Sequence, residues 1–187
     1  PLSNRFLQKY NRNDVLKDFN LEDNKINILF FGGGEFGLGK TRTFEIFESF
    51  VKYSSNMQII AIAGKNEKMK LAFEKIVDEN NAKKNVRVLE FTNKVPELMS
   101  ISNLVVTKPG GMTTTESLAS HLPMVVINPI PGQEEENAEF LEQNGIAIWL
   151  KKSDNAWEIL NNLFNNPNKL EEMKNNTKKL AKPYSIK

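Results

Sequence analysis

Apolar residues along the chain form two alternating patterns, short continuous runs and longer stretches with helical spacing. The short runs predict buried strands over residues 26–31, 57–64, 86–91, 103–108, 124–129 and 146–150. The spaced stretches predict helices over residues 42–53, 67–80, 95–100, 113–121, 135–145, 154–164 and 168–181. Apolar strands that alternate with helices are typical of a parallel sheet covered on both faces. The pattern therefore predicts an α/β domain with a doubly wound parallel sheet of about six strands.

The first 25 residues do not share this pattern. Residues 1–25 are polar, rich in Asn and Lys, and contain no strand-like run, although residues 12–19 have the spacing of a short helix. We expect residues 1–25 to be an interdomain linker or entry segment, and residues 26–187 to be one domain. Because the chain begins with Pro1 rather than Met, we also expect it to be a piece of a longer protein.

Composition narrows the class of protein. A chain of 187 residues with 40% apolar content can bury one core. Its 25 basic and 23 acidic residues give a formal charge of +2, which does not suggest a nucleic-acid partner. The absence of cysteine excludes disulfides and thiolate metal sites, and a single His argues against a histidine zinc site. No apolar run approaches the ~18 residues of a membrane span. We therefore expect no metal site and no cofactor.

Function in a doubly wound sheet is expected at the carboxyl ends of its strands, and the loop after the first strand is rich in glycine. Two nucleotide-binding patterns overlap in this loop: Gly32, Gly34 and Gly37 fit G-x-G-x-x-G, while Gly34, Gly39, Lys40 and Thr41 fit G-x-x-x-x-G-K-T. A P-loop NTPase also needs an acid for Mg²⁺ at a strand end, where Glu90 is a weak candidate. A dinucleotide site needs an acid after the second strand, which instead ends Gly64-Lys65. A tight turn without a ligand is a further alternative, and all three leave a loop that can approach a phosphate.

A second loop, from Lys108 to Ser117, follows the fourth predicted strand. Gly110 and Gly111 turn the chain, and a helix predicted from about Thr113 would direct its free N–H groups at a bound anion. Glu116 has two interpretations that do not exclude each other. It can form a capping box with Thr113, or it can accept hydrogen bonds from ribose hydroxyls.

The third loop runs from Asn128 to Leu141 and places several acids and amides at the start of a helix. Three consecutive glutamates and Asn137 follow Gln133. Acids in a first turn stabilise the helix dipole, so a capped, solvated helix is one interpretation. A cluster of acceptors that binds sugar hydroxyls is the other. Together the three loops could hold the phosphate, ribose and sugar parts of a nucleotide sugar.

These loops also resemble a known family. The segment TKPGGMTTTESLASHLPMVVINPIPGQEEENAEFL, with FFGGGEFGLG, IAGKN and VLEFTNKVPELMSISNLVV, resembles the C-terminal half of glycosyltransferase family 28. The similarity is strongest to the monogalactosyldiacylglycerol synthases and the processive diacylglycerol glucosyltransferases. It implies a GT-B glycosyltransferase, in which two Rossmann-like domains face each other and the C-terminal one binds the UDP-sugar donor. The opening PLSNRF resembles the linker between the two halves.

The resemblance assigns roles to individual residues. The nucleotide-sugar-binding residues that it implies are Gly33, Gly34, Lys65, Phe91, Thr92, Gly110, Gly111, Met112, Thr113, Glu116, Gln133, Glu136 and Asn137. Among them, Phe91 and Thr92 would flank the uracil, Glu116 would bind ribose, and Glu136 with Asn137 would hold the sugar. Lys108 and Lys65 are candidates to stabilise the leaving diphosphate. The resemblance implies no bound metal and no dinucleotide, and it implies that the catalytic base lies in the N-terminal half.

The sequence departs from the family pattern at two places. Lys40-Thr41 completes a P-loop pattern, which we interpret as coincidence. His121 stands where the family often has Gly, and we expect a structural role at a helix end, where an imidazolium suits the dipole.

The predicted activity is transfer of a hexosyl group from UDP-glucose or UDP-galactose to diacylglycerol or a glycolipid, and the residues do not decide between the two sugars. The full-length protein is expected to be cytoplasmic and peripherally attached to membrane, while this chain alone is expected to be inactive. A nucleotide-binding ATPase or GTPase and a non-catalytic UDP-sugar-binding module remain as alternatives.

Overall fold

In the computed structural model, six parallel strands of the described chain form one sheet in the order β3-β2-β1-β4-β5-β6. The structure describes residues 2–33 and 40–185. The strands are β1 Ile26–Phe31, β2 Met57–Gly64, β3 Val86–Glu90, β4 Leu104–Thr107, β5 Met124–Ile127 and β6 Ala147–Leu150. Successive strands are added on one side of β1 up to β3 and on its other side from β4 onward. The switch point of the sheet, where ligands bind in doubly wound folds, therefore lies between β1 and β4.

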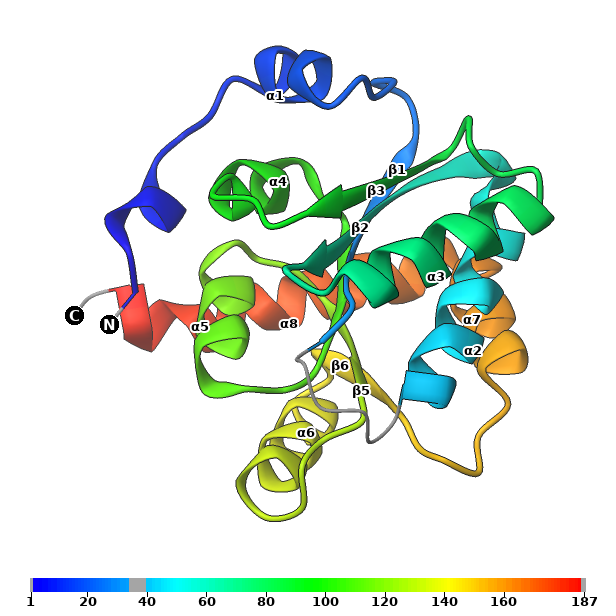
Figure 1. Ribbon diagram of the computed structural model, residues 1–187. Coiled ribbons are helices and arrows are strands. Elements are labelled where there is room, and N and C mark those ends of the chain that lie inside the picture. The colour runs from blue at the N-terminus through cyan, green and yellow to red at the C-terminus, as the bar shows by residue number, and fades with distance from the viewer. Residues whose placement is uncertain (1, 34–39, 186–187) are drawn as a thin grey trace.

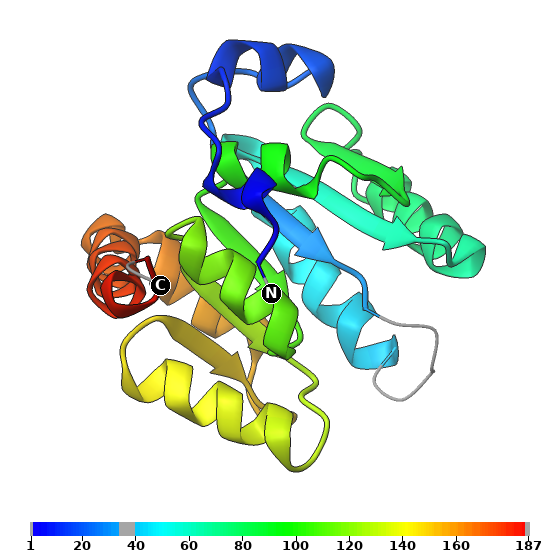
Figure 2. The same cartoon turned by 90° about the vertical axis from the view of Figure 1, so that its left-hand side faces the viewer.

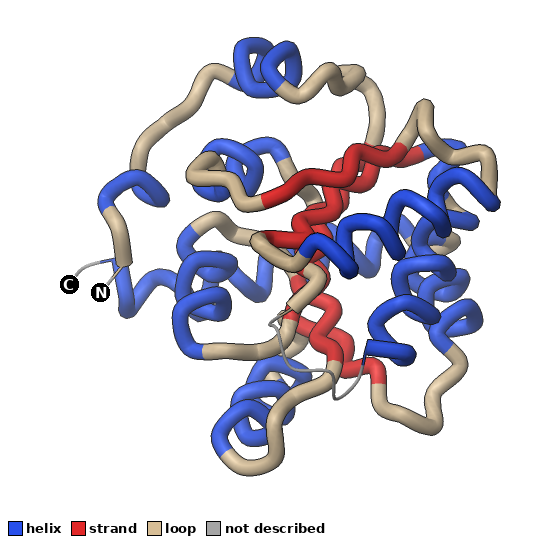
Figure 3. Tube along the Cα trace, in the orientation of Figure 1, coloured by secondary structure: helices blue, strands red, loops and turns tan. Residues whose placement is uncertain are grey.

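Helices cover both faces of this sheet, which Figures 1 and 3 show on edge between two helical layers. They are α1 Arg12–Asp18, α2 Lys40–Lys52, α3 Glu67–Glu79, α4 Val95–Ile101, α5 Gly111–Ala119, α6 Gln133–Gln143, α7 Ala156–Phe164 and α8 Pro167–Ser185, with short 3-10 turns η1 Asn4–Leu7 and η2 Ser54–Asn56. In Figure 1, α2, α3 and α7 lie on one side of the sheet, and α4, α5 and α6 lie on the other. The predicted α/β fold with a doubly wound sheet is confirmed.

Each face of the sheet has its own apolar core. On the side of α2 and α3, the ring of Phe30 contacts the rings of Phe47 and Phe73 edge to face, at centroid distances of 5.1 and 5.9 Å. On the other side, buried Leu98 and Leu141 pack against strand residues of the sheet. Strands buried on both faces read as continuous apolar runs, and for this reason they could be recognised in the sequence.

Two helices begin earlier than their apolar spacing indicates. Helix α5 begins at Gly111 rather than Thr113, and α6 begins at Gln133 rather than Glu135. In both cases a glycine precedes the helix: Gly110 is extended at φ −72° and ψ 156°, and Gly132 has φ 98°. The polar first residues of these helices carry no apolar spacing, so the apolar signal starts two residues late.

The entry segment, residues 2–25, packs along the helix α4 side of the sheet (Figure 2). Val15 and Leu16 of α1 are buried against Ile101 of α4. Farther along, the backbone of Glu22 exchanges hydrogen bonds of 2.7 and 3.0 Å with the side chain of Gln58 on β2. The division of the chain at residue 25 into linker and domain stays a prediction. In the described part of the chain, no helix is long and apolar enough to span a membrane.

Candidate functional site

The loop after β1 and the loop after β4 meet at the switch point of the sheet. Gly33 adopts φ 92°, a left-handed conformation that favours glycine, and a Cβ placed on it would lie 3.8 Å from Cε of Lys108. Gly32 must also lack a side chain, because a Cβ there would collide with Sδ of Met69 on α3. Bare backbone and a lysine side chain thus lie together at the position where a phosphate would be held.

The P-loop interpretation requires an acidic residue near the glycine loop to bind Mg²⁺, and Glu90 does not fill this role. Glu90 lies at the end of the edge strand β3, separated from β1 by β2, and its carboxylate pairs with Lys70 at 2.8 Å. The hydrogen bond from Lys70 holds the pKa of Glu90 below its ordinary value. Gly34, Gly37 and Gly39 lie outside the described residues. Within the described residues, no three acidic or histidine side chains cluster as a metal site.

Helix α5 directs its N-terminus toward this region. Its first hydrogen bond within the helix runs from Thr114 N to the carbonyl of Gly110 at 2.9 Å. The amides of Gly111, Met112 and Thr113 precede this first donor and therefore have no acceptor within the helix. Because Gly110 is the N-cap, Thr113 is the third helical residue and cannot cap the helix. The capping-box interpretation, one of the two that the sequence left open for Glu116, is therefore wrong.

Glu116 lies one turn inside α5 and keeps its carboxylate available. Among the described residues, no side chain or backbone group forms a hydrogen bond or ion pair with this carboxylate, although the Glu116 carbonyl accepts from Ser120 N at 3.0 Å. Partial burial raises its pKa above the ordinary value, because desolvation disfavours the charged form. A half-buried carboxylate without a protein donor is stabilised when ligand hydroxyl groups donate hydrogen bonds to it, and ribose offers two such groups.

The start of helix α6 lies beside the start of α5. Ile130 N donates to a carboxylate oxygen of Glu134 at 3.0 Å, and Gly132 N donates to Glu135 at 3.4 Å. A Cβ placed on Gly110 would lie 4.0 Å from the other oxygen of Glu134. Both glutamates thus satisfy the backbone of their own loop, as the capped-helix interpretation predicts, whereas Glu136 is exposed.

An asparagine joins the second and third loops. Asn137 Nδ2 donates to the carbonyl of Pro109 at 2.9 Å, and its Oδ1 accepts from Gln133 Nε2 at 3.0 Å. The two helix N-termini are therefore fixed to each other by a side chain that the resemblance assigns to the sugar. Its assignment to the sugar, like that of Glu136 and Gln133, stays a prediction.

Lys65 and Phe91 form a separate pair at the ends of β2 and β3. Lys65 Nζ lies 5.3 Å from the centre of the Phe91 ring, a cation–π contact, and both border a cavity of about 140 Å³. The Phe91 side chain is 65% exposed and is therefore available for stacking. The next residue, Thr92, uses its hydroxyl to accept from Lys94 N at 3.0 Å, which folds the loop into a tight turn.

Exposed apolar side chains and a larger cavity border the same edge of the sheet. Met112 and Ile130 are 54% and 56% exposed, one beside each helix N-terminus. A cavity of about 620 Å³ extends from Lys108 and Ile130 to Trp149 and Lys152 at the end of β6. The edge thus combines amide groups and lysines for anions with apolar surface for rings.

His121 lies at the C-terminal end of α5, as expected, but its charge state was predicted wrongly. Its backbone has φ 55°, which explains why glycine suits this position. Partial burial, together with Lys178 and Lys174, lowers the pKa of His121. The neutral imidazole is therefore favoured, and attraction of an imidazolium to the helix dipole is not its role.

The sequence did not reveal a hydrogen bond between the loop after β5 and helix α2. Asn128 adopts φ 46° at the end of β5, and its Nδ2 donates to Thr43 Oγ1 of α2 at 2.8 Å. The Asn-Pro dipeptide at residues 128–129 was the available signal, since Asn tolerates a left-handed conformation and Pro favours a turn.

Comparisons with known proteins identify the family of this chain. The model of the glycosyltransferase family 28 C-terminal domain matches residues 28–187. The chain is 32% identical over 180 residues to a processive diacylglycerol beta-glucosyltransferase of Bacillus subtilis (strain 168), covering 96% of the chain and 46% of the relative. It is 35% identical over 173 residues to the Staphylococcus aureus (strain JH9) protein of that name, covering 92% and 43%. The chain thus spans about half the length of the curated relatives it matches.

Solved structures show the same fold at low identity. HepE from Anabaena, solved with UDP and glucose, has a TM-score of 0.71 at 15% identity, covering 96% of this chain and 50% of its own. MurG from Acinetobacter baumannii has a TM-score of 0.68 at 23% identity, covering 93% and 50%. With the fold of glycosyltransferases and a family match over nearly its whole length, this chain belongs to glycosyltransferase family 28 as its C-terminal domain.

Proposed function

We propose that this chain is the donor-binding half of a glycosyltransferase that moves a hexosyl group from a UDP-sugar to diacylglycerol or a glycolipid. The observation that carries the proposal is the meeting of the α5 N-terminus with Gly33 and Lys108 at the switch point. The carboxylate of Glu116, which has no partner among the described residues, lies one turn away. Amide groups and a lysine suit a diphosphate, and a carboxylate suits ribose hydroxyls.

The proposed mechanism depends on stabilising the leaving group. As the glycosidic bond to the diphosphate breaks, negative charge grows on the phosphate oxygens. The first-turn amides of α5 and the ammonium of Lys108 would stabilise that charge more strongly than they stabilise the intact donor. The exposed ring of Phe91 supplies a stacking surface for the base, and the exposed Glu136 at the start of α6 accepts from the hexose.

The names of the relatives favour glucose over galactose as the transferred hexose, and diacylglycerol as the acceptor. An acceptor embedded in a bilayer implies peripheral contact of the full-length protein with a membrane, on the cytoplasmic side where nucleotide sugars are made.

Titration calorimetry tests the proposal directly. The chain should bind UDP without added Mg²⁺, and bind it at least about tenfold more tightly than ADP, because the 91–94 loop reads the base. Stronger, Mg²⁺-dependent binding of ATP would instead support a P-loop nucleotidase.

A further inference from the structure

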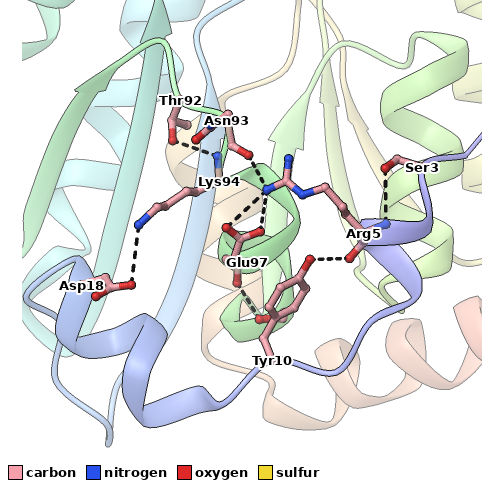
Figure 4. A network of polar contacts seen from close by, with 9 residues as sticks. Ser3, Arg5, Tyr10, Asp18, Thr92, Asn93, Lys94 and Glu97 are labelled. Carbon is pink, nitrogen blue, oxygen red and sulfur yellow. Dashed lines mark hydrogen bonds and ion pairs between the residues drawn. The ribbon is translucent and has the colours of Figure 1, made fainter.

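We propose that the entry segment, residues 2–25, holds the 91–94 loop in its ligand-binding shape, with Arg5 as the positioning residue. The inference rests on the proposed function, because it assigns the 91–94 loop to the nucleotide base. Figure 4 shows the network that carries it.

Arg5 contacts this loop through one guanidinium nitrogen. Nη2 donates to the backbone carbonyl of Asn93 at 2.7 Å and to the carboxylate of Glu97 at 3.0 Å. Asn93 follows Thr92 directly, and Glu97 lies in the first turn of α4, which begins where the loop ends. A single side chain therefore connects the middle of the loop with the helix that follows it.

The position of Arg5 is itself fixed by its own segment. The amide of Arg5 donates to Ser3 Oγ at 3.3 Å, and its carbonyl accepts from the hydroxyl of Tyr10 at 2.6 Å. Phe6 packs against the apolar core on the same face of the sheet. Since its backbone is held on both sides, Arg5 acts from a fixed support rather than from a free tail.

A second contact holds the loop from the other side. Lys94 Nζ lies 3.7 Å from Asp18 at the end of α1, and Lys94 N donates to Thr92 Oγ1 within the loop. The entry segment thus contacts the loop at two points, Asn93 and Lys94, leaving the 65% exposed ring of Phe91 facing outward. Ordering this loop before binding reduces the conformational entropy that the loop loses when a ligand binds.

The matched control is Arg12, in the same segment. Arg12 Nε pairs with Asp23 at 2.9 Å, and its side chain is 46% exposed against 45% for Arg5. In the described structure, neither Arg12 nor Asp23 bonds to residues 91–97, so Arg12→Ala removes a comparable ion pair without touching the loop.

The experiment compares Arg5→Ala, Arg5→Lys and Arg12→Ala in this chain by UDP calorimetry, melting temperature and amide hydrogen exchange without ligand. We expect Arg5→Ala to weaken UDP binding about fivefold and to speed exchange over residues 91–97 about threefold, at a melting temperature close to that of Arg12→Ala. Arg5→Lys, which keeps the charge but loses the planar fork, should fall between the two. Arg12→Ala should change neither binding nor exchange in this loop.

Each other outcome has a defined meaning. Unchanged UDP affinity in Arg5→Ala, or an equal loss in Arg12→Ala, would overturn the inference and leave Arg5 as a general stabilising residue. If the unmodified chain bound no UDP, the proposed function would fail, and exchange alone would judge the positioning role: faster exchange only in Arg5→Ala supports it, and equal exchange in both variants refutes it.

Discussion

Asn137 on helix α6 donates a hydrogen bond of 2.9 Å to the carbonyl of Pro109, directly before the turn that starts helix α5. Because Gly110 follows Pro109, this bond sets the direction in which the α5 N-terminus faces a ligand. The residue that the family resemblance assigns to the sugar thus also supports the turn at the proposed diphosphate site, and these two roles predict different binding losses.

Asn137→Ala should weaken UDP and UDP-glucose alike, by roughly 1–2 kcal/mol, because the bond that orients the α5 turn is lost for both ligands. Glu136→Ala should weaken only UDP-glucose, since Glu136 is exposed and free UDP has no hexose to contact. Calorimetry with both ligands on both variants separates the roles.

Asn144→Ala is the control for Asn137, since Asn144 Nδ2 bonds the carbonyl of Phe140 at 2.8 Å at the opposite end of α6. It should alter stability alone. If Asn137→Ala spared UDP and reduced only UDP-glucose, the bond to Pro109 would have no part in binding the diphosphate.

Glu116→Gln should separate ligand binding from stability. Loss of a charged acceptor for ribose should weaken UDP binding by roughly 1–3 kcal/mol. Burial raises the pKa of Glu116 in the folded chain, so the folded state binds more protons than the unfolded state between the ordinary and raised pKa values. Stability contributed by Glu116 therefore falls as pH rises through that window, and at pH 7 the neutral Gln variant should melt no lower than the unmodified chain.

A melting curve at pH 7 and one at pH 4 check this expectation, since the advantage of Gln should disappear where Glu116 is protonated in both states. A lower melting temperature in Glu116→Gln at pH 7 with unchanged UDP affinity would restore a purely structural role for the carboxylate.

The sheet and its helices could be predicted because their signals are local. A strand such as Ile26–Phe31 is apolar at every position except Asn27, and the helix over residues 67–79 repeats its apolar residues at helical spacing. The loops could be located for the same reason, since they follow the strands. Helix starts at Gly111 and Gln133 were placed two residues late, because the preceding glycines, not the apolar pattern, determine them.

Contacts between loops could not be predicted in this way. The bond between Arg5 and Glu97 joins residues 92 positions apart, and that between Asn137 and Pro109 joins residues 28 apart. Such pairs depend on how the elements pack, and a single amino-acid sequence carries no signal for them. The family resemblance named the residues of the second and third loops, but it did not show that they bond to each other.

His121→Gly should stabilise the chain. A non-glycine residue at φ 55° is strained, and glycine relieves that strain at a small entropic cost, which gives a net gain of about 0.5–1 kcal/mol. The folded pKa of His121 is lowered from 6.5, so the unfolded state binds more protons and stability falls as pH drops below that value. The gain from His121→Gly should therefore grow between pH 8 and pH 5.5.

Thermal melts across this pH range provide the measurement, and Asn81→Gly provides the control. Asn81 has φ 53°, but Asn tolerates this conformation, so that substitution should change little at any pH. A pH-independent effect of His121→Gly would show that neither burial nor the lysines of α8 lower the pKa of the imidazole.

The chain alone should bind the donor and yet form no glycolipid. Transfer to an alcohol requires a base within hydrogen-bond reach of the acceptor hydroxyl. The single His lies at the far end of α5, Glu134 and Glu135 accept from their own loop backbone, and Glu116 is assigned to ribose. The chain also spans only 46% of the Bacillus subtilis relative, so surfaces for the lipid and for excluding water from the donor are expected in the remaining half.

Incubation of the chain with UDP-glucose and diacylglycerol in detergent micelles should therefore yield no glucosyl-diacylglycerol, while calorimetry on the same sample still detects UDP binding. The full-length relative in identical micelles serves as the positive control. Glycolipid formed by this chain at a rate near that of the relative would mean that Glu134, Glu135 or Glu136 acts as the base, and Ala substitution of each would then identify which one.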